Sequence, residues 1–110
     1  MLLPSFHVAV TLDSKPDLAD LLEEVGSEVL AEWQVFALQL GVRSSAIEGI
    51  EKTERGDPKR CIFKALAQWE KSPSPKHPYT WHTVVQVLRK QIIDRPDVAS
   101  RIEEKYGASS

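Results

Sequence analysis

The chain has 110 residues, of which 42% are hydrophobic and 27% are charged, and its formal net charge is −2. This length and composition are typical of one globular domain. We expect the domain to be soluble and cytoplasmic, because no apolar run approaches the roughly 20 residues that span a bilayer and the first residues lack the pattern of a secretion signal. The only cysteine, Cys61, excludes an internal disulfide and a thiolate-rich zinc site.

The first part of the chain predicts an extended arm followed by a short helix. Residues 1–16 are expected to form the arm or the end of an upstream segment, since apolar side chains occupy every second position of residues 6–12. From residue 17 the apolar side chains follow helical spacing until Gly26, which favours a helix stop. The outer face of this helix carries three acidic residues, Asp20, Glu23 and Glu24.

A second helix is predicted after Ser27, which is a suitable N-cap. Its apolar face contains Val29, Trp33, Phe36, Ala37 and Leu40. Gly41 is expected to end the helix, with Val42 folding back onto the last turn. A helix with so much apolar surface is normally central in a domain.

A third helix is predicted from a capping box formed by Ser45 and Glu48. Its inward-facing residues are Ile47 and Ile50, and Gly56 is expected to end it. The remaining side chains of this segment are mostly polar, which is typical of a solvated outer face.

The pair Asp57-Pro58 predicts the start of a fourth helix, because Asp is a good N-cap and proline is tolerated at the first helical position. The inward stripe is Ile62, Ala65, Leu66 and Trp69, and Cys61 beside it is expected to be a small core residue. The outer face carries a basic stripe, Arg60, Lys64 and Lys71. Phe63 lies off the inward stripe, so it is expected either to contact a partner or to pack under the N-terminal arm.

Residues 72–78 contain three prolines and therefore predict a stiff non-helical loop. Ser72-Pro73 and Ser74-Pro75 within it resemble proline-directed phosphorylation sites. Thr80 is expected to cap a fifth helix with an apolar face formed by Trp81, Val84, Val85, Leu88 and Ile92. A sixth helix, beginning near Pro96, is expected to bury Val98, Ile102 and Tyr106, and residues 108–110 form a tail.

Charge is distributed unevenly along the chain. Residues 1–54 hold ten acidic and three basic side chains, a balance of −7, whereas residues 55–95 hold nine basic and three acidic ones, a balance of +6. Opposite charge on two parts of one rigid body favours contacts with similar bodies that need not close into a ring. The alternative interpretation of the same pattern is that both charged regions are solvated surfaces without a binding role.

Three strings in this order resemble the death domain family: Trp33-x-x-Phe36-Ala37-x-x-Leu40-Gly41-Val42, then Ile47-x-x-Ile50, then Leu66-x-x-Trp69. The likeness extends over residues 17–106. It implies an all-α, six-helix antiparallel Greek-key bundle at residues 17–107, without catalytic activity or cofactors. It also implies a core that contains Trp33, Phe36, Leu40, Ile47, Ile50, Leu66, Trp69, Trp81 and Leu88.

The resemblance further implies binding to other death domains, in a homo- or hetero-oligomer that transmits apoptotic or innate-immune signals. Such a domain is often the intracellular part of a receptor or adaptor. By position, the candidate contact residues are Asp20, Glu23, Glu24, Arg60, Lys64 and Lys71. Phe63 is added to them because it lies off the inward stripe, next to the basic residues.

The sequence also offers residues for two other functions. Cys61 with His77 or His82 could supply a nucleophile and a base, but no orienting carboxylate or oxyanion site is evident beside them. The basic segment could form a helix-turn-helix that binds nucleic acid, although six acidic residues between positions 17 and 32 would repel a duplex unless they faced away from it. We therefore expect no enzyme activity and no nucleic-acid partner, and keep DNA binding as the alternative.

Overall fold

The computed structural model describes residues 12–106. This part of the chain is all-helical, as predicted, and its only extended pairing is an isolated bridge between Ser74 and His77. The first helix consists of α1 (Leu18–Leu21), which continues directly into a π-helical segment, η2 (Leu22–Gly26); we refer to the two together as helix 1. The others are α2 (Trp33–Gln39), α3 (Ser44–Thr53), α4 (Pro58–Lys71), α5 (Trp81–Arg89) and α6 (Pro96–Tyr106).

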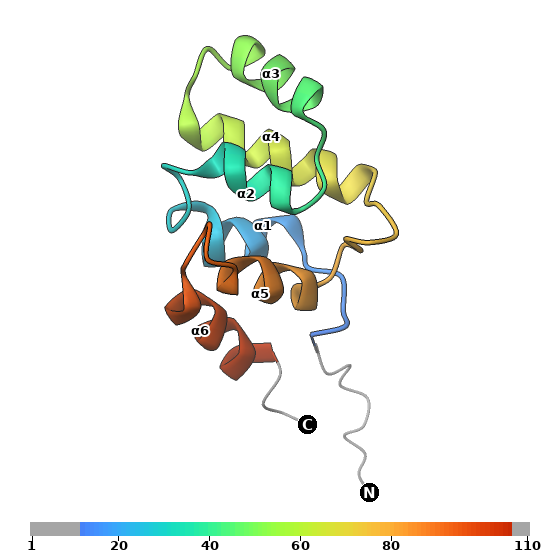
Figure 1. Ribbon diagram of the computed structural model, residues 1–110, viewed down its shortest axis with the longest axis vertical. Helices are drawn as coiled ribbons and strands as arrows, with labels where there is room; N and C mark the ends of the chain where they lie inside the picture. Colours follow the sequence, from blue (N-terminus) through green and yellow to red (C-terminus); the bar gives the residue numbers. More distant parts are fainter. Residues whose placement is uncertain (1–11, 107–110) are drawn as a thin grey trace, which may run out of the picture.

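The helices lie one above another along the long axis of the molecule (Figure 1). α3 lies at one end, where it contacts α2 and α4, and α6 lies at the other end, where it packs against α5. Helix 1 is between them and contacts both α4 and α6. Elements distant in the sequence are thus held together by helix 1.

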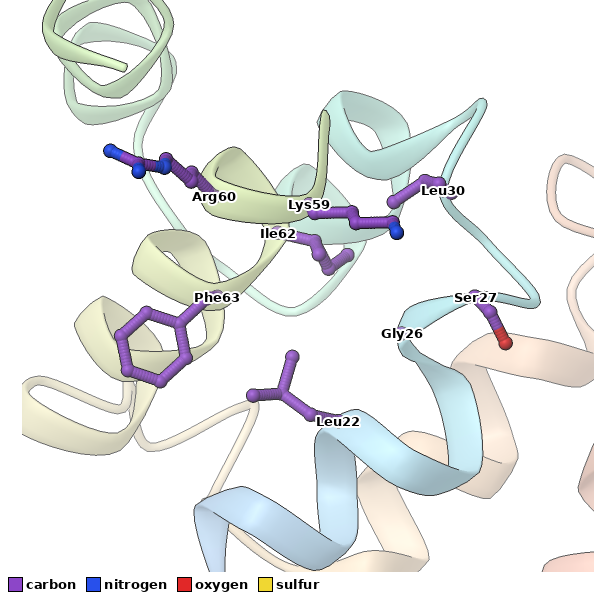
Figure 2. A pocket seen from close by; sticks show the side chains of 8 residues that line it. All are labelled: Leu22, Gly26, Ser27, Leu30, Lys59, Arg60, Ile62 and Phe63. Carbon is purple, nitrogen blue, oxygen red and sulfur yellow. The ribbon is translucent and has the colours of Figure 1, made fainter. Parts of the chain in front are cut away.

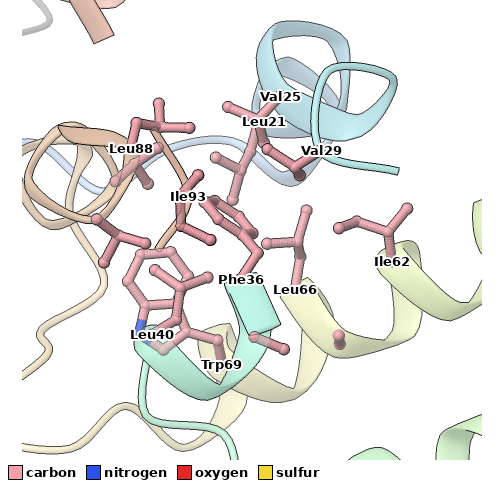
Figure 3. Close-up of a cluster of buried hydrophobic side chains, with 14 of the residues drawn as sticks. Leu21, Val25, Val29, Phe36, Leu40, Ile62, Leu66, Trp69, Leu88 and Ile93 are labelled. Carbon is pink, nitrogen blue, oxygen red and sulfur yellow. The ribbon is translucent and has the colours of Figure 1, made fainter. Parts of the chain in front are cut away.

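One apolar core joins these elements, and Figure 3 shows its centre, where side chains of helix 1, α2, α4 and α5 meet. The predicted core residues that are buried are Trp33, Phe36, Leu40, Ile47, Leu66, Trp69, Trp81 and Leu88. Ile50 is only partly buried and packs against the edge of the core. Cys61 is fully buried, in agreement with its predicted role as a small core residue.

Two tryptophans connect the helices to neighbouring segments through specific contacts. The indole N–H of Trp69 donates a hydrogen bond to the carbonyl oxygen of His77 at 2.9 Å, and its ring meets Tyr79 edge-on at a centroid distance of 4.7 Å. Trp81 stacks on Tyr106, with centroids 4.3 Å apart. The first set ties the proline loop to α4, and the second ties α5 to α6.

Tyr79 provides a test of this packing, because its buried hydroxyl has no hydrogen-bond partner among residues 12–106. We expect Tyr79→Phe to leave the free energy of unfolding at neutral pH unchanged or slightly higher, since an unpaired buried polar group is removed. A loss of more than about 1 kcal/mol in urea denaturation would contradict this.

The same variant has a predicted pH dependence. Burial, with smaller contributions from Glu70 and Asp17, raises the pKa of Tyr79 from 10.0 to about 12. The unfolded chain therefore loses this proton before the folded chain does, and stability falls as pH rises from 10 towards 12. Tyr79→Phe should lose stability less steeply over that range, which denaturation near pH 7 and near pH 11 would measure.

Several predicted helix ends are confirmed. The Asp57 carboxylate accepts a hydrogen bond from the Lys59 amide at the start of α4, and the Thr80 hydroxyl accepts one from the Thr83 amide at the start of α5. Gly41 adopts a φ of 95°, and the amide of Val42 reaches the Ala37 carbonyl at 3.0 Å. This is the glycine-dependent turn that the sequence indicated.

Three local predictions were wrong. α2 begins at Trp33 and not after Ser27, because residues 27–32 form consecutive turns that nevertheless bury Val29. α3 begins at Ser44 without a side-chain cap, so the expected capping box is not formed. α5 ends at Arg89, and the turn after it buries Ile93 while Ile92 stays 60% exposed.

The described end of the predicted arm lies against the start of α5. The carbonyl oxygen of Ser14 accepts a hydrogen bond from the Trp81 amide at 3.3 Å, and that of Leu12 accepts one from the His82 amide at 2.8 Å. These bonds satisfy two amides that have no partner within the helix. The rest of the predicted arm, residues 1–11, and the tail at 108–110 lie outside the described residues.

Candidate protein-interaction surface

An apolar groove of about 430 Å³ lies between helix 1, the turns that follow it and the first half of α4. Figure 2 shows Leu22 of η2 and Phe63 of α4 on opposite sides of it. The complete lining is Leu22, Gly26, Ser27, Leu30, Lys59, Arg60, Ile62 and Phe63. Phe63 is 41% exposed, which is unusual for so large an apolar side chain.

The groove follows from how α4 begins. Asp57 and Pro58 fix the first turn, so that Ile62 points into the core while Arg60 and Phe63 remain on the outer surface. Leu30 comes from the turns that replace the expected start of the second helix. Two of the predicted contact residues, Arg60 and Phe63, thus lie in one cavity.

The cations of α4 are largely free of intramolecular partners. Arg60 makes one exposed contact of 3.8 Å with Asp57, a pair of the kind that contributes little to stability. Lys59, Lys64 and Lys71 are exposed and form no ion pair within residues 12–106. Lys59 and Arg60 line the apolar groove, and Lys64 follows Phe63 directly.

The three acidic residues predicted on helix 1 differ in their surroundings. Asp20 and Glu23 are exposed. Glu24 is only 7% exposed, and its carboxylate lies 2.6 Å from the Nζ of Lys105 and 3.4 Å from the Nε of Arg101. It is therefore part of the contact between helix 1 and α6, and we leave it out of the candidate surface.

The next acidic residue, Glu28, is neutralised in the same way. Its carboxylate lies 2.6 Å from Nη2 of Arg95 and 3.5 Å from Nη1 of Arg101. Arg95 also pairs with Asp97, and that hydrogen bond holds the pKa of Asp97 below its usual value. The acidic surface is consequently smaller than the residue count predicts.

The residues considered for catalysis are not brought together. Cys61 is buried in α4, and burial, followed by the nearby carboxylates of Glu51, Glu54 and Asp57, raises the pKa of its thiol. His77 lies in the loop beyond the other end of α4, where its Nδ1 is 3.2 Å from the Ser74 hydroxyl. His82 is exposed near the start of α5. A thiol with a raised pKa is a poor nucleophile at neutral pH.

Residues 12–106 contain neither a cluster of metal ligands nor a membrane-spanning helix. No three His, Cys, Asp or Glu side chains in this range are grouped so that they could hold a metal ion. No helix in the same range is long and apolar enough to cross a bilayer.

Comparison of the chain with models of known protein families, with curated proteins and with solved structures finds no match. Residues 12–106 therefore define the class of this protein as an all-helical domain, with six helices around one apolar core.

Sequence reasoning missed Lys59, Leu22 and Leu30 as parts of the groove. Helical spacing makes Leu22 one of the apolar side chains between residue 17 and Gly26, which predicts an inward position, and Leu30 lies in the turns three residues before α2 begins. Lys59 precedes Arg60 directly, so the high density of cations at the start of α4 was the available signal.

Proposed function

We propose that this chain is a death domain, with its helices in antiparallel Greek-key order, and that it acts as a non-enzymatic module in cytoplasmic signalling for apoptosis or innate immunity. Its partners would be other death domains, in copies of itself or in an adaptor or receptor. The proposal is supported by the three strings of the resemblance, whose apolar residues lie in or against one core.

The observation that carries the proposed interaction is the apolar groove flanked by cations: Lys59 and Lys64 form no ion pair within residues 12–106, and Arg60 forms only one exposed pair, with Asp57. An exposed aromatic residue beside a cavity is a typical anchor of protein contacts. A complementary surface would present apolar side chains and carboxylates, and the exposed Glu48 and Glu51 of α3 supply such carboxylates on a second copy. Each exposed ion pair contributes about 0.2–1 kcal/mol, so a stable complex would require several contacts together.

The groove favours a protein partner over nucleic acid. Phosphate backbones are bound mainly by hydrogen bonds and charge, and an apolar cavity supplies neither. The exposed Asp20 and Glu23 on helix 1 would also repel a polyanion that lay across this side of the molecule.

Two variants test the proposed surface. We expect Phe63→Ser and Lys64→Glu each to weaken association about tenfold, or about 1.4 kcal/mol, while the melting temperature and circular dichroism stay nearly unchanged. Light scattering over a range of salt concentrations would measure the association, which should weaken as salt rises. Association with purified death domains would be measured in parallel, because the partner need not be an identical chain.

Lys76→Glu is the matched control, since it makes the same charge change on an exposed loop residue that neither lies on α4 beside Phe63 nor lines the groove. It should alter association less than twofold. Equal effects of the two charge reversals would mean that only net charge matters. Unchanged association in both Phe63→Ser and Lys64→Glu, or salt-dependent retention of the wild-type chain on DNA, would contradict the proposed function.

A further inference from the structure

The two Ser-Pro pairs of the loop after α4 have different surroundings. Ser72 follows the last residue of α4; it is exposed, and its hydroxyl has no hydrogen-bond partner within the described part of the chain. Ser74 is half-buried and its hydroxyl is paired with the imidazole of His77 at 3.2 Å. Ser74 Oγ also lies 3.3 Å from the point where a side chain on Gly41 would begin. Only the first hydroxyl is free to react without breaking a contact.

Ser72 borders a cavity of about 640 Å³ between this loop and the link that joins α2 to α3. Its lining includes Gly41, Arg43, Gln68, Ser72 and Ser74. Arg43 is the only cation among them. It is exposed and forms no ion pair with any residue from 12 to 106.

We propose that Ser72 is a phosphorylation site for a proline-directed kinase and that Arg43 binds the resulting phosphate across this cavity. The Ser72 oxygen attacks the γ-phosphorus of a nucleoside triphosphate held by the kinase. The bond to the diphosphate leaving group breaks, and the hydroxyl proton passes to the base of the kinase. The product gains about −1.5 to −2 charges and three strong acceptor oxygens.

A guanidinium is well suited to this group, because its planar donors can pair with two phosphate oxygens at once. The contact would join the start of α3 to the end of α4, two places separated by 29 residues along the chain. Phosphate on Ser74 would act in the opposite direction, since it would displace the hydroxyl from His77 and press against Gly41. This proposal does not depend on death-domain assembly.

The acceptor is tested by treating the full chain with a purified proline-directed kinase and ATP and locating the phosphate by mass spectrometry. Phosphate should appear on Ser72 of the wild type and persist in Ser74→Ala, but Ser72→Ala should lose it. Modification of Ser74 in preference to Ser72, or of neither residue, would overturn the assignment.

The phosphate contact is tested by genetic incorporation of phosphoserine at position 72 or 74. At position 72, phosphorus NMR should give a second phosphate pKa about one unit lower than in the same protein with Arg43→Gln. The melting temperature should rise by about 3 °C, and Arg43→Gln should abolish the rise. Phosphoserine at position 74 should lower the melting temperature whether or not Arg43 is present. Identical phosphate titrations with and without Arg43 would refute the contact.

Discussion

Trp69→Ala should lower the free energy of unfolding by about 3–5 kcal/mol, a large part of the 5–15 kcal/mol that holds a typical domain together. The side chain is 1% exposed in the centre of the core, so its removal leaves a cavity that the neighbouring helices cannot fully close. The change also leaves the His77 carbonyl without its indole donor and Tyr79 without its aromatic neighbour. Urea denaturation followed by circular dichroism would measure the loss.

Two further variants separate the causes of that loss. Trp69→Phe keeps much of the apolar volume but removes the N–H donor, so it should cost less than Trp69→Ala while amide exchange in residues 72–78 becomes faster. Phe63→Ala truncates an aromatic residue of the same helix on its exposed side and should cost well under half as much. Similar losses for Trp69→Ala and Phe63→Ala would mean that the core is not centred on Trp69.

The features that could be predicted from the sequence are those determined by residues within about one helical turn of one another. Asp57 followed by Pro58, Thr80 before the fifth helix and Gly41 after the second each depend on one residue type with one backbone role. The inward stripe of α4 follows in the same way from the spacing of apolar residues, and all four of its residues are buried.

The start of the second helix could not be predicted, because two local signals competed there. Ser27 is a suitable N-cap, but the chain first makes turns that bury Val29 before Trp33 begins the helix. Packing against the core outweighs the capping preference, which contributes only about 1 kcal/mol. The same turns bring Leu30 into the groove. Because the helix start was predicted wrongly, Leu30 was not predicted as part of the site.

Charge on the surface was predictable only in part. The exposed cations of α4 were correctly placed by helical spacing, whereas the pairing of Glu24 with Arg101 and Lys105 spans 77 and 81 residues. No periodicity connects positions so distant. The sequence therefore overestimates how many acidic side chains of the first half of the chain are available to a partner.

Glu24→Gln should lower the free energy of unfolding by about 1–3 kcal/mol, because it removes the buried charge that pairs with two cations of α6. The loss should stay at the lower end of that range, since Lys105 and Arg101 are about half exposed and can regain water. Glu23→Gln is the matched control: the neighbouring residue is exposed, and its effect should lie within about 0.5 kcal/mol.

A double-mutant cycle with Lys105→Met isolates the pair itself. If the contact stabilises the fold, the double variant should lose less free energy of unfolding than the sum of the two single losses, since each single variant already removes the same interaction. The cycle also bears on the proposed association. If Glu24→Gln weakens binding only as far as it lowers stability, Glu24 acts inside the domain, and Asp20 and Glu23 are the carboxylates that helix 1 can offer to a partner. A loss of binding without a loss of stability would return Glu24 to the contact surface.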